Sequence, residues 1–88
     1  MQTTHHLEAA ELVKIVPAKK QARFYRLAIW PDLFGGFSLA REYGRIGHSG
    51  RLCLTPFPES ETARQAFARI LRRKQRRGYV PSASRFAD

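Results

Sequence analysis

The sequence has a single cysteine, few acidic residues and no long apolar run. Because Cys53 is the only cysteine, neither an intrachain disulfide nor a thiolate metal cluster can form within one chain. No segment is as long and apolar as a membrane span, and the N-terminus lacks an apolar region of signal-peptide length. We therefore expect a cytoplasmic protein in a reducing compartment, without a metal site and away from membranes.

Signatures of enzymes are missing as well. The sequence contains neither a phosphate-binding P-loop nor a dinucleotide fingerprint. Cys53 has no neighbouring acid that would complete a triad, and His48 falls in a predicted turn. His5 and His6 are an adjacent pair without further metal ligands. We expect no enzymatic activity, no catalytic residue and no cofactor.

Positive charge is what the sequence has in excess. Sixteen lysines and arginines stand against seven acidic residues, giving a net charge of +9 at pH 7. A large net charge of one sign destabilises a small folded domain, because like charges repel one another. Such a charge usually helps the domain to bind a partner of the opposite sign. Nucleic acid is the first candidate, with an acidic protein or an anionic membrane surface as alternatives.

The length allows one small domain. A chain of 88 residues buries roughly 60–65% of the surface that its unfolded form exposes. The core must be thin, which leaves little room for a deep active-site cavity and ample room for a binding face.

Alternating apolar residues predict strands at residues 12–16, 23–30, 37–44 and 51–55, separated by turns rich in glycine or proline. A helix follows at about residues 61–76, because apolar residues recur there at helical spacing. Ser60 is the expected N-cap and Gly78 the expected C-terminal stop.

These elements predict an α+β fold, in which an antiparallel β-sheet meander of three to four strands packs against one amphipathic C-terminal helix. We expect residues 1–11 to be a flexible leader, residues 12–80 a single domain and residues 81–88 a flexible tail.

The stretch REYGRIG, residues 41–47, carries the chemistry of interest. Gly44 permits a close backbone approach to a partner, the Tyr43 ring can stack on a sugar or base, and Arg45 can fork onto a phosphate. The same residues also fit a strand-end tyrosine on the rim of the core with an arginine in solvent. Residue chemistry alone leaves these two interpretations open.

REYGRIG resembles the signature of the WGR domain family, named for Trp-Gly-Arg, with Tyr43 in the tryptophan position. ARFYRLAIW resembles the opening double-aromatic strand of the family, LFGGFSLAREYGRIG its second strand and turn, and KQRRGYV its closing segment. The likeness covers about residues 12–80. The chain is also similar to small, stand-alone bacterial members of the family.

The resemblance implies a sheet packed on a helix, and DNA binding. In multidomain poly(ADP-ribose) polymerases, WGR domains bind near the 5′ terminus of DNA breaks and contact neighbouring domains. The stacking tryptophan of the family corresponds to Tyr43, its arginine to Arg45 and its basic residue before the double aromatic to Arg23. Tyrosine offers a smaller stacking area than tryptophan. Without a partner domain in the chain, the signalling role of the arginine is not expected to carry over.

We therefore expect binding to the phosphate backbone of DNA without sequence preference, and leave open a preference for ends or nicks. RNA and an acidic protein docking on the same basic face also stay open as partners. If DNA is bound, the protein would be nucleoid-associated. Lys74 lies within the apolar stripe of the helix, either snorkelling at a fraying end or meeting a phosphate. The expected DNA-binding residues are Arg23, Arg41, Tyr43, Gly44, Arg45, Arg72, Arg73, Lys74, Arg76 and Arg77.

Overall fold

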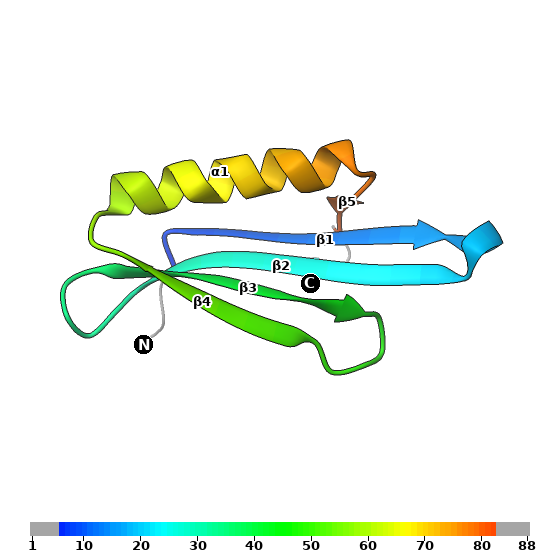
Figure 1. The fold of residues 1–88 in the computed structure, drawn as a ribbon, viewed down its shortest axis with the longest axis horizontal. Helices are drawn as coiled ribbons and strands as arrows, with labels where there is room; N and C mark the ends of the chain where they lie inside the picture. Colours follow the sequence, from blue (N-terminus) through cyan, green and yellow to red (C-terminus); the bar gives the residue numbers. More distant parts are fainter. Residues whose placement is uncertain (1–5, 83–88) are drawn as a thin grey trace.

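The computed structural model describes residues 6–82, which form one antiparallel sheet with a helix lying across one of its faces (Figure 1). The strands lie in the order β4-β3-β2-β1-β5. Their bounds are β1 (Glu8–Val16), β2 (Gln21–Pro31), β3 (Phe37–Arg45), β4 (Arg51–Phe57) and β5 (Val80–Pro81), and the helix is α1 (Ser60–Arg76).

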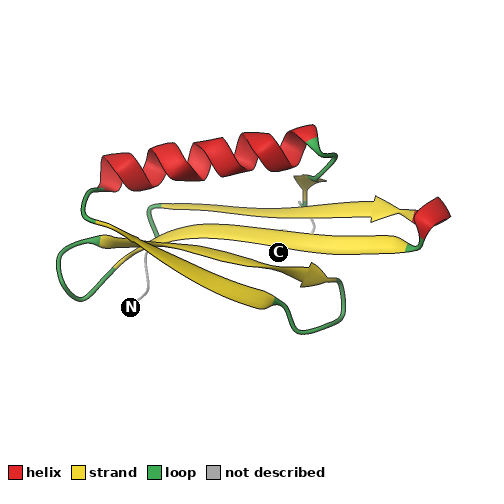
Figure 2. Cartoon of the chain, viewed as in Figure 1, coloured by secondary structure: helices red, strands yellow, loops and turns green. Residues whose placement is uncertain are grey.

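The predicted α+β class is confirmed, and the sheet has one strand more than the three or four expected. The extra strand is β5, which pairs with Leu12 and Val13 along the outer side of β1. Figure 2 shows the two layers by element type, with the short 3-10 turn η1 (Pro17–Lys19) at the corner between β1 and β2.

The first strand begins at Glu8, four residues before the expected start at Leu12. Residues 8–11, expected as part of the leader, pair with residues 26–29 of β2. Glutamate and alanine have low strand propensity, so the alternation does not show in the sequence; pairing with β2 overrides it. Residues 1–5 of the expected leader and residues 83–88 of the expected tail lie outside the described residues.

Helix α1 begins one residue earlier than expected. Ser60 is its first residue, and Glu59, with extended backbone angles, holds the N-cap position. No side chain caps this end; the Thr62 hydroxyl instead donates to the Glu59 carbonyl oxygen at 3.0 Å. The prediction of Ser60 as N-cap is therefore wrong, because Glu59 is the last residue to keep strand-like angles after the prolines that end β4.

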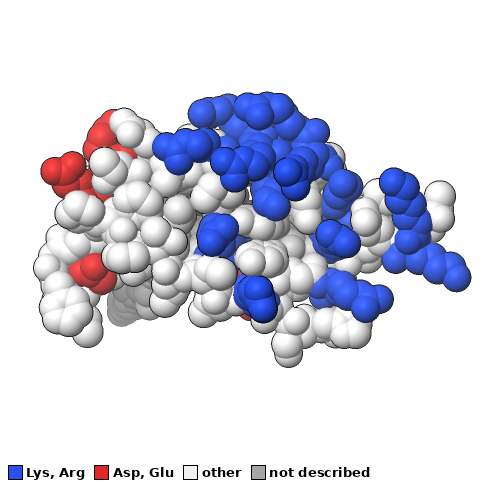
Figure 3. Space-filling model, in the orientation of Figure 1, with Lys and Arg blue, Asp and Glu red and all other residues white. Residues whose placement is uncertain are grey.

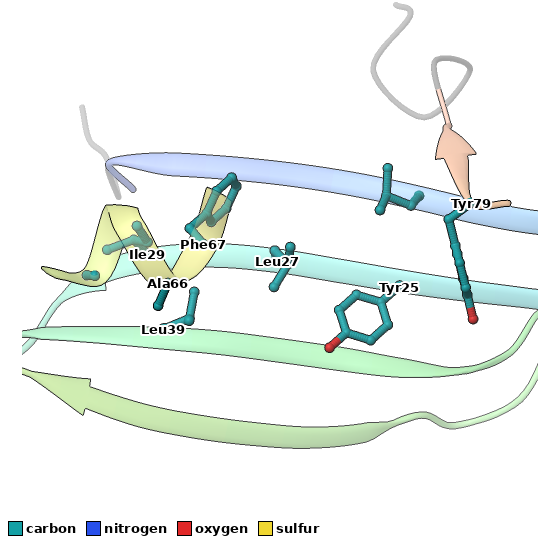
Figure 4. Close-up of a cluster of buried hydrophobic side chains, with 9 residues drawn as sticks. Tyr25, Leu27, Ile29, Leu39, Ala66, Phe67 and Tyr79 are labelled. Carbon is teal, nitrogen blue, oxygen red and sulfur yellow. The ribbon is translucent and has the colours of Figure 1, made fainter. Parts of the chain in front are cut away.

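The core lies between α1 and the face of the sheet that the helix covers. Leu12, Leu27, Ile29 and Leu39 are at most 2% exposed. Ala63 and Ala66 are buried on the helix, and their small size allows a close approach to the sheet. Figure 4 shows the core side chains in a row along β2, with Ile29, Leu39 and Phe67 toward one end and Tyr25 and Tyr79 toward the other.

The chain turns back sharply after the helix. Gly78 has a φ of +100°, a conformation that glycine adopts without steric cost. The turn folds Tyr79 inward, where its ring is buried and meets the Tyr25 ring edge to face at 6.1 Å. The prediction that Gly78 stops the helix is confirmed.

Candidate nucleic-acid interface

The REYGRIG residues lie at one end of the sheet, here called the distal end, where β1 and β3 finish and α1 ends. The opposite, proximal end is where α1 begins. The antiparallel register places Arg45 opposite Arg23 and Tyr43 opposite Tyr25. Since side chains two residues apart point to the same face, Arg41 shares the helix-covered face with Tyr43.

Three tyrosines form a cluster at the distal end. The Tyr25 and Tyr43 rings are stacked, with centroids 5.3 Å apart and planes 8° from parallel. Tyr25 is buried, whereas Tyr43 is half-buried at the edge of the cluster. Tyr43 thus packs on the rim of the core, as one of the two interpretations of the sequence held, and also keeps part of its surface exposed. Its stacking on a nucleotide stays a prediction.

Lys74 reaches this cluster from the helix. Its Nζ lies 4.5 Å from the Tyr25 ring centroid and 5.6 Å from that of Tyr79, within the range of cation–π contacts. Burial lowers the pKa of Lys74, and nearby guanidinium groups lower it further, first those of Arg77 and Arg73. Lys74 lies within the apolar stripe as predicted, and its ammonium group sits at the boundary between core and solvent.

Arg41 is held against the same cluster. Hydrogen bonding to the Tyr25 hydroxyl raises the pKa of Arg41, outweighing the opposing effect of burial. The contact joins Arg41 to the ring that Tyr43 and Lys74 also touch. Arg41 thus interacts with Tyr25 on the helix-covered face, which it shares with Tyr43.

Positive charge concentrates at the distal end, over the second half of α1 and the adjoining strands, while acidic side chains gather at the proximal end (Figure 3). Within residues 6–82, ion pairs involve only two of the basic residues. Arg26 bridges Glu11 and Glu42 on the uncovered face of the sheet, and Arg64 pairs with Glu8. The cations of the distal end therefore have no carboxylate at ion-pair distance in the part of the chain that is described.

The helix residues of the predicted site do not all converge. Lys74 faces the sheet, and Arg73 and Arg77 are near enough to influence its pKa. Arg72 and Arg76 are exposed on the outer side of the helix, away from Tyr43. The basic segment is thus a band around the helix end, and only part of it borders the tyrosine cluster.

Gly44 lies close to other parts of the chain. A Cβ atom at Gly44 would lie 3.1 Å from the Gly50 Cα and 3.5 Å from Phe24 Cε2. The close approach that glycine permits is thus made within the chain, on the face of the sheet opposite to the Tyr43 side chain. The approach of a partner at Gly44 stays a prediction, and the contact with Phe24 could not be read from the sequence because the strand pairing was unknown.

Three residues of the distal end were missed by sequence reasoning. Lys14 pairs with Arg23 and its Nζ lies 6.0 Å from the Tyr79 ring centroid. Arg51 is the cross-strand neighbour of Tyr43. Gly50 is needed because a Cβ there would lie 2.6 Å from Phe24 Cζ. The cross-strand register is the signal that would have found all three.

No helix within residues 6–82 is both long and apolar enough to cross a membrane. In the same range, no group of three or more histidine, cysteine or acidic side chains is placed to hold a metal ion.

These features define a small basic α+β domain with an aromatic and cationic cluster at one end of its sheet. The family model described as "WGR domain" matches residues 8–86, so the chain belongs to the WGR domain family. This membership is consistent with a nucleic-acid-binding module. The expected family is confirmed, and the match starts at Glu8, where β1 begins.

One curated relative supports the assignment. The chain is 39% identical over 71 residues to the "Uncharacterized protein y4dW" of Sinorhizobium fredii (strain NBRC 101917 / NGR234). The alignment covers 81% of this chain and 35% of the relative, so the chain spans about a third of the protein that it matches. No solved structure matches significantly.

Proposed function

We propose that this WGR domain binds DNA through its distal end, mainly by contacts to phosphates, without sequence preference and with a preference for strand ends. The observation that carries the proposal is the gathering of cations around an aromatic cluster without neutralising carboxylates. If these arginines and lysines served only the stability of the fold, we would expect them to form ion pairs with acidic residues. Arg26 does so on the opposite face of the sheet.

The strand cations suit a phosphate backbone by their spacing. Arg23 and Arg45 are cross-strand partners, and Arg41 lies four residues before Arg45 on the same face. Cross-strand neighbours lie about 4.5–5.5 Å apart at their Cα atoms, and long guanidinium side chains can spread from there to successive phosphates. If the protein neutralises about six phosphates, log K falls with log salt at a slope of roughly −5.

A lack of sequence preference follows from how the helix is used. The face of α1 that carries Ala63, Ala66 and Phe67 is buried against the sheet. What remains outside is rich in arginine, a surface suited to phosphates more than to base edges in the major groove.

Tyr43 is the residue proposed to favour strand ends. One of its ring faces packs on Tyr25 and the side chain stays half exposed. A terminal nucleotide has an unstacked base face, which an exposed aromatic ring can cover without opening a duplex. Phosphate contacts alone would bind continuous and interrupted DNA equally well.

The test is fluorescence anisotropy with short duplexes that carry or lack a 5′ phosphate, across a salt series and against a closed circular competitor. We expect tight binding that the circle competes poorly. Full competition by the circle would contradict the end preference while leaving the charge-based binding. No binding at modest salt would contradict the DNA role and favour an acidic protein partner; equal binding of single-stranded RNA would extend the role to RNA.

The charge dependence has a matched control within the chain. Arg45→Gln removes a cation of the distal end, whereas Arg64→Gln removes one that pairs with Glu8. Both substitutions change the net charge by the same amount. Only Arg45→Gln is expected to weaken binding clearly, so an equal loss in both variants would show that net charge, and not the distal end, governs the interaction.

A further inference from the structure

The two sides of the sheet end in differently protected strands. On one side, β5 pairs with Leu12 and Val13 of β1, and the charged Lys14 comes next along that strand. On the other side, β4 is the last strand, and nothing within residues 6–82 pairs with its outer edge (Figure 1). Free N–H and C=O groups at such an edge can pair with another chain, unless lysine, proline or a covering segment prevents it.

The hydrogen-bond pattern shows which backbone groups of β4 are free. Ile46 donates its N–H to the Ala22 carbonyl oxygen at 2.9 Å, so even-numbered residues of β3 turn toward β2 and odd-numbered ones toward β4. The β3–β4 register pairs odd with odd residues, so Leu52 and Leu54 turn their N–H and C=O groups outward. Pro56 has the same direction, as expected for a proline at a sheet edge, since it has no N–H to donate.

The side chains along this edge are apolar. Leu52 and Leu54 are 60% and 62% exposed on the uncovered face of the sheet. Beside them lies a hollow of about 350 Å³ whose lining includes Ala28, Trp30 and Ala40. Exposed apolar residues that adjoin one another commonly mark an interaction surface. The edge of β4 thus combines free backbone groups with an apolar surface, and either feature can bind another strand.

We propose that the edge of β4 binds the same edge of a second copy of the chain, antiparallel and centred on Cys53, so that the two sheets become one. In this register, Leu52 of each copy lies opposite Leu54 of the other. Each such pair exchanges two backbone hydrogen bonds, and the leucines of both copies meet around a two-fold axis. This symmetry closes the assembly at two chains. The inference does not depend on the proposed DNA binding.

The distribution of charge favours this antiparallel arrangement. β4 runs from the basic distal end to the acidic proximal end of the domain (Figure 3). Antiparallel pairing therefore places the distal end of one copy alongside the proximal end of the other, where Glu59 and Glu61 lie at the start of α1. Parallel pairing would bring the two basic ends together. Because the sequence Leu-Cys-Leu is the same on both sides of Cys53, a second copy matches it without any other partner.

Proline limits the length of the pairing. In the proposed register, Pro56 lies opposite Gly50 of the second copy and cannot donate a hydrogen bond to it. The paired segment is therefore confined to residues 51–55. We expect it to bury less than about 1,200 Å², the lower bound for most stable complexes. The dimer should consequently form and dissociate with protein concentration.

The first experiment is sedimentation equilibrium of the full chain over a concentration series, under reducing conditions and without DNA. Leu54→Lys adds a charge at the edge of β4. Ile15→Lys is the matched control, since Ile15 is 59% exposed on the same face but belongs to β1. We expect a dissociation constant below about 1 mM for the wild type and for Ile15→Lys. Leu54→Lys should weaken association at least about tenfold, because the two added lysines repel near the two-fold axis.

The second experiment tests the register, with Cys53 as a probe. The two Cys53 residues would face each other in a pair without hydrogen bonds, with Cα atoms about 4.5 Å apart, a separation that a disulfide can span. The control is Thr55→Cys in a Cys53→Ser background. Residues 55 of the two copies would be about 13 Å apart along the strands, too far for a disulfide. Diamide takes up the two electrons and two protons of the thiols, and non-reducing electrophoresis measures the cross-linked fraction.

We expect efficient cross-linking of the wild type and little of the control. Equal cross-linking of the two proteins would overturn the register, because collision would then account for it. A chain that neither dimerises over the concentration series nor cross-links would overturn the inference and leave the edge to a strand of another protein. Equal weakening by Leu54→Lys and Ile15→Lys would also overturn it.

Circular dichroism checks the folding of each variant. If Leu54→Lys does not fold, cross-linking of the wild type still decides the outcome, since it needs no change at the leucines. Every measurement is made without DNA, so failure of this inference leaves the proposed DNA binding untouched.

Discussion

The two ends of the domain use the same two layers in different ways. At the proximal end, Leu39 and Ile29 pack against small helix residues and Phe67, so the interior carries only apolar side chains. At the distal end, the space between helix and sheet is closed by Tyr25 and Tyr79, with a lysine amine over the rings. Tyrosines bring a polar handle to the surface that aliphatic residues lack. The proximal end therefore contributes mainly to stability, whereas the distal end brings polar and charged groups to the surface.

The charges differ between the ends for two separate reasons. Acidic residues at the start of a helix and basic residues at its end both favour the helix dipole, which accounts for Glu61 and for Arg73 and Arg76. The strand residues Arg23 and Arg45 have no such explanation, because a strand has no comparable dipole. The strand cations, more than the helix cations, therefore point to an anionic partner.

The largest expected effect is a loss of stability on substitution of a core residue at the proximal end. Leu39→Ala should lower the free energy of unfolding by about 2–5 kcal/mol, since it removes a fully buried side chain and leaves a cavity. Leu52→Ala, at a residue that is 60% exposed on the uncovered face, should change it little. Urea unfolding measures both, and similar losses in the two variants would contradict the assignment of the core.

Gly50→Ala should destabilise the distal end through steric overlap. The new Cβ would lie 2.6 Å from Phe24 Cζ and 2.8 Å from the Tyr43 carbonyl oxygen. We expect a loss of about 1–3 kcal/mol in the free energy of unfolding. In a Phe24→Ala background the additional loss should shrink without vanishing, because the clash with the carbonyl remains. An equal loss in both backgrounds would show that Phe24 is not the obstacle.

Tyr43→Ala should weaken binding to DNA ends by about 1–3 kcal/mol if the ring stacks on a terminal nucleotide. Tyr43→Phe keeps the ring and should bind nearly as well as the wild type. Competition between linear and circular DNA measures the effect, with circular dichroism as the check on folding. If end preference survives unchanged in a folded Tyr43→Ala variant, the stacking role is wrong; if that variant unfolds while Tyr43→Phe binds normally, the ring serves the core first.

Arg45→Gln should lower the affinity for duplex about tenfold at 0.1 M salt and reduce the magnitude of the salt slope by about 0.9, as expected for one lost phosphate contact. Arg64→Gln, at the other end of the helix, should leave the slope almost unchanged. Salt titrations of the two variants make this comparison. A salt slope of smaller magnitude for Arg64→Gln than for Arg45→Gln would contradict the division between the ends.

The smallest effect concerns pH. Burial first, and then the neighbouring arginines, lower the pKa of Lys74 in the folded state, so the unfolded chain binds more protons here. The resulting cost to stability is full below the folded pKa and disappears as the pH rises toward 10.5, the ordinary value. Wild type should therefore gain stability relative to Lys74→Met over this range. A constant difference between the two proteins would contradict the lowered pKa. The groups that face Lys74 are Arg23, Arg41, Arg73, Arg77, Tyr25 and Tyr79.

Periodicity predicted most of what depends on side-chain direction. Strand alternation placed Tyr43 and Arg41 on one face, and helical spacing placed Lys74 inside the apolar stripe. Both follow from local geometry, which a sequence displays directly. These residues meet around Tyr25, which the sequence analysis did not include in the site.

Register and strand ends were not predictable in the same way. The start of β1 at Glu8 depends on pairing with β2, and the role of Gly44 depends on Phe24 lying opposite it. Such features are set by contacts between distant segments, and no local signal reports them. The three residues of the distal end that were missed, Lys14, Gly50 and Arg51, also depend on the cross-strand register.

The most direct test of the account is a titration of the isotope-labelled protein with a short duplex, followed by the amide signals in nuclear magnetic resonance spectra. We predict that the largest shifts gather at the distal end, at Lys14, Arg23, Tyr43, Arg45 and Arg77, while residues 32–36 and Ala63 stay unaffected. Shifts centred on the proximal end, or on Leu52 and Leu54 of the uncovered face, would contradict the claim that the distal end is the DNA-binding surface.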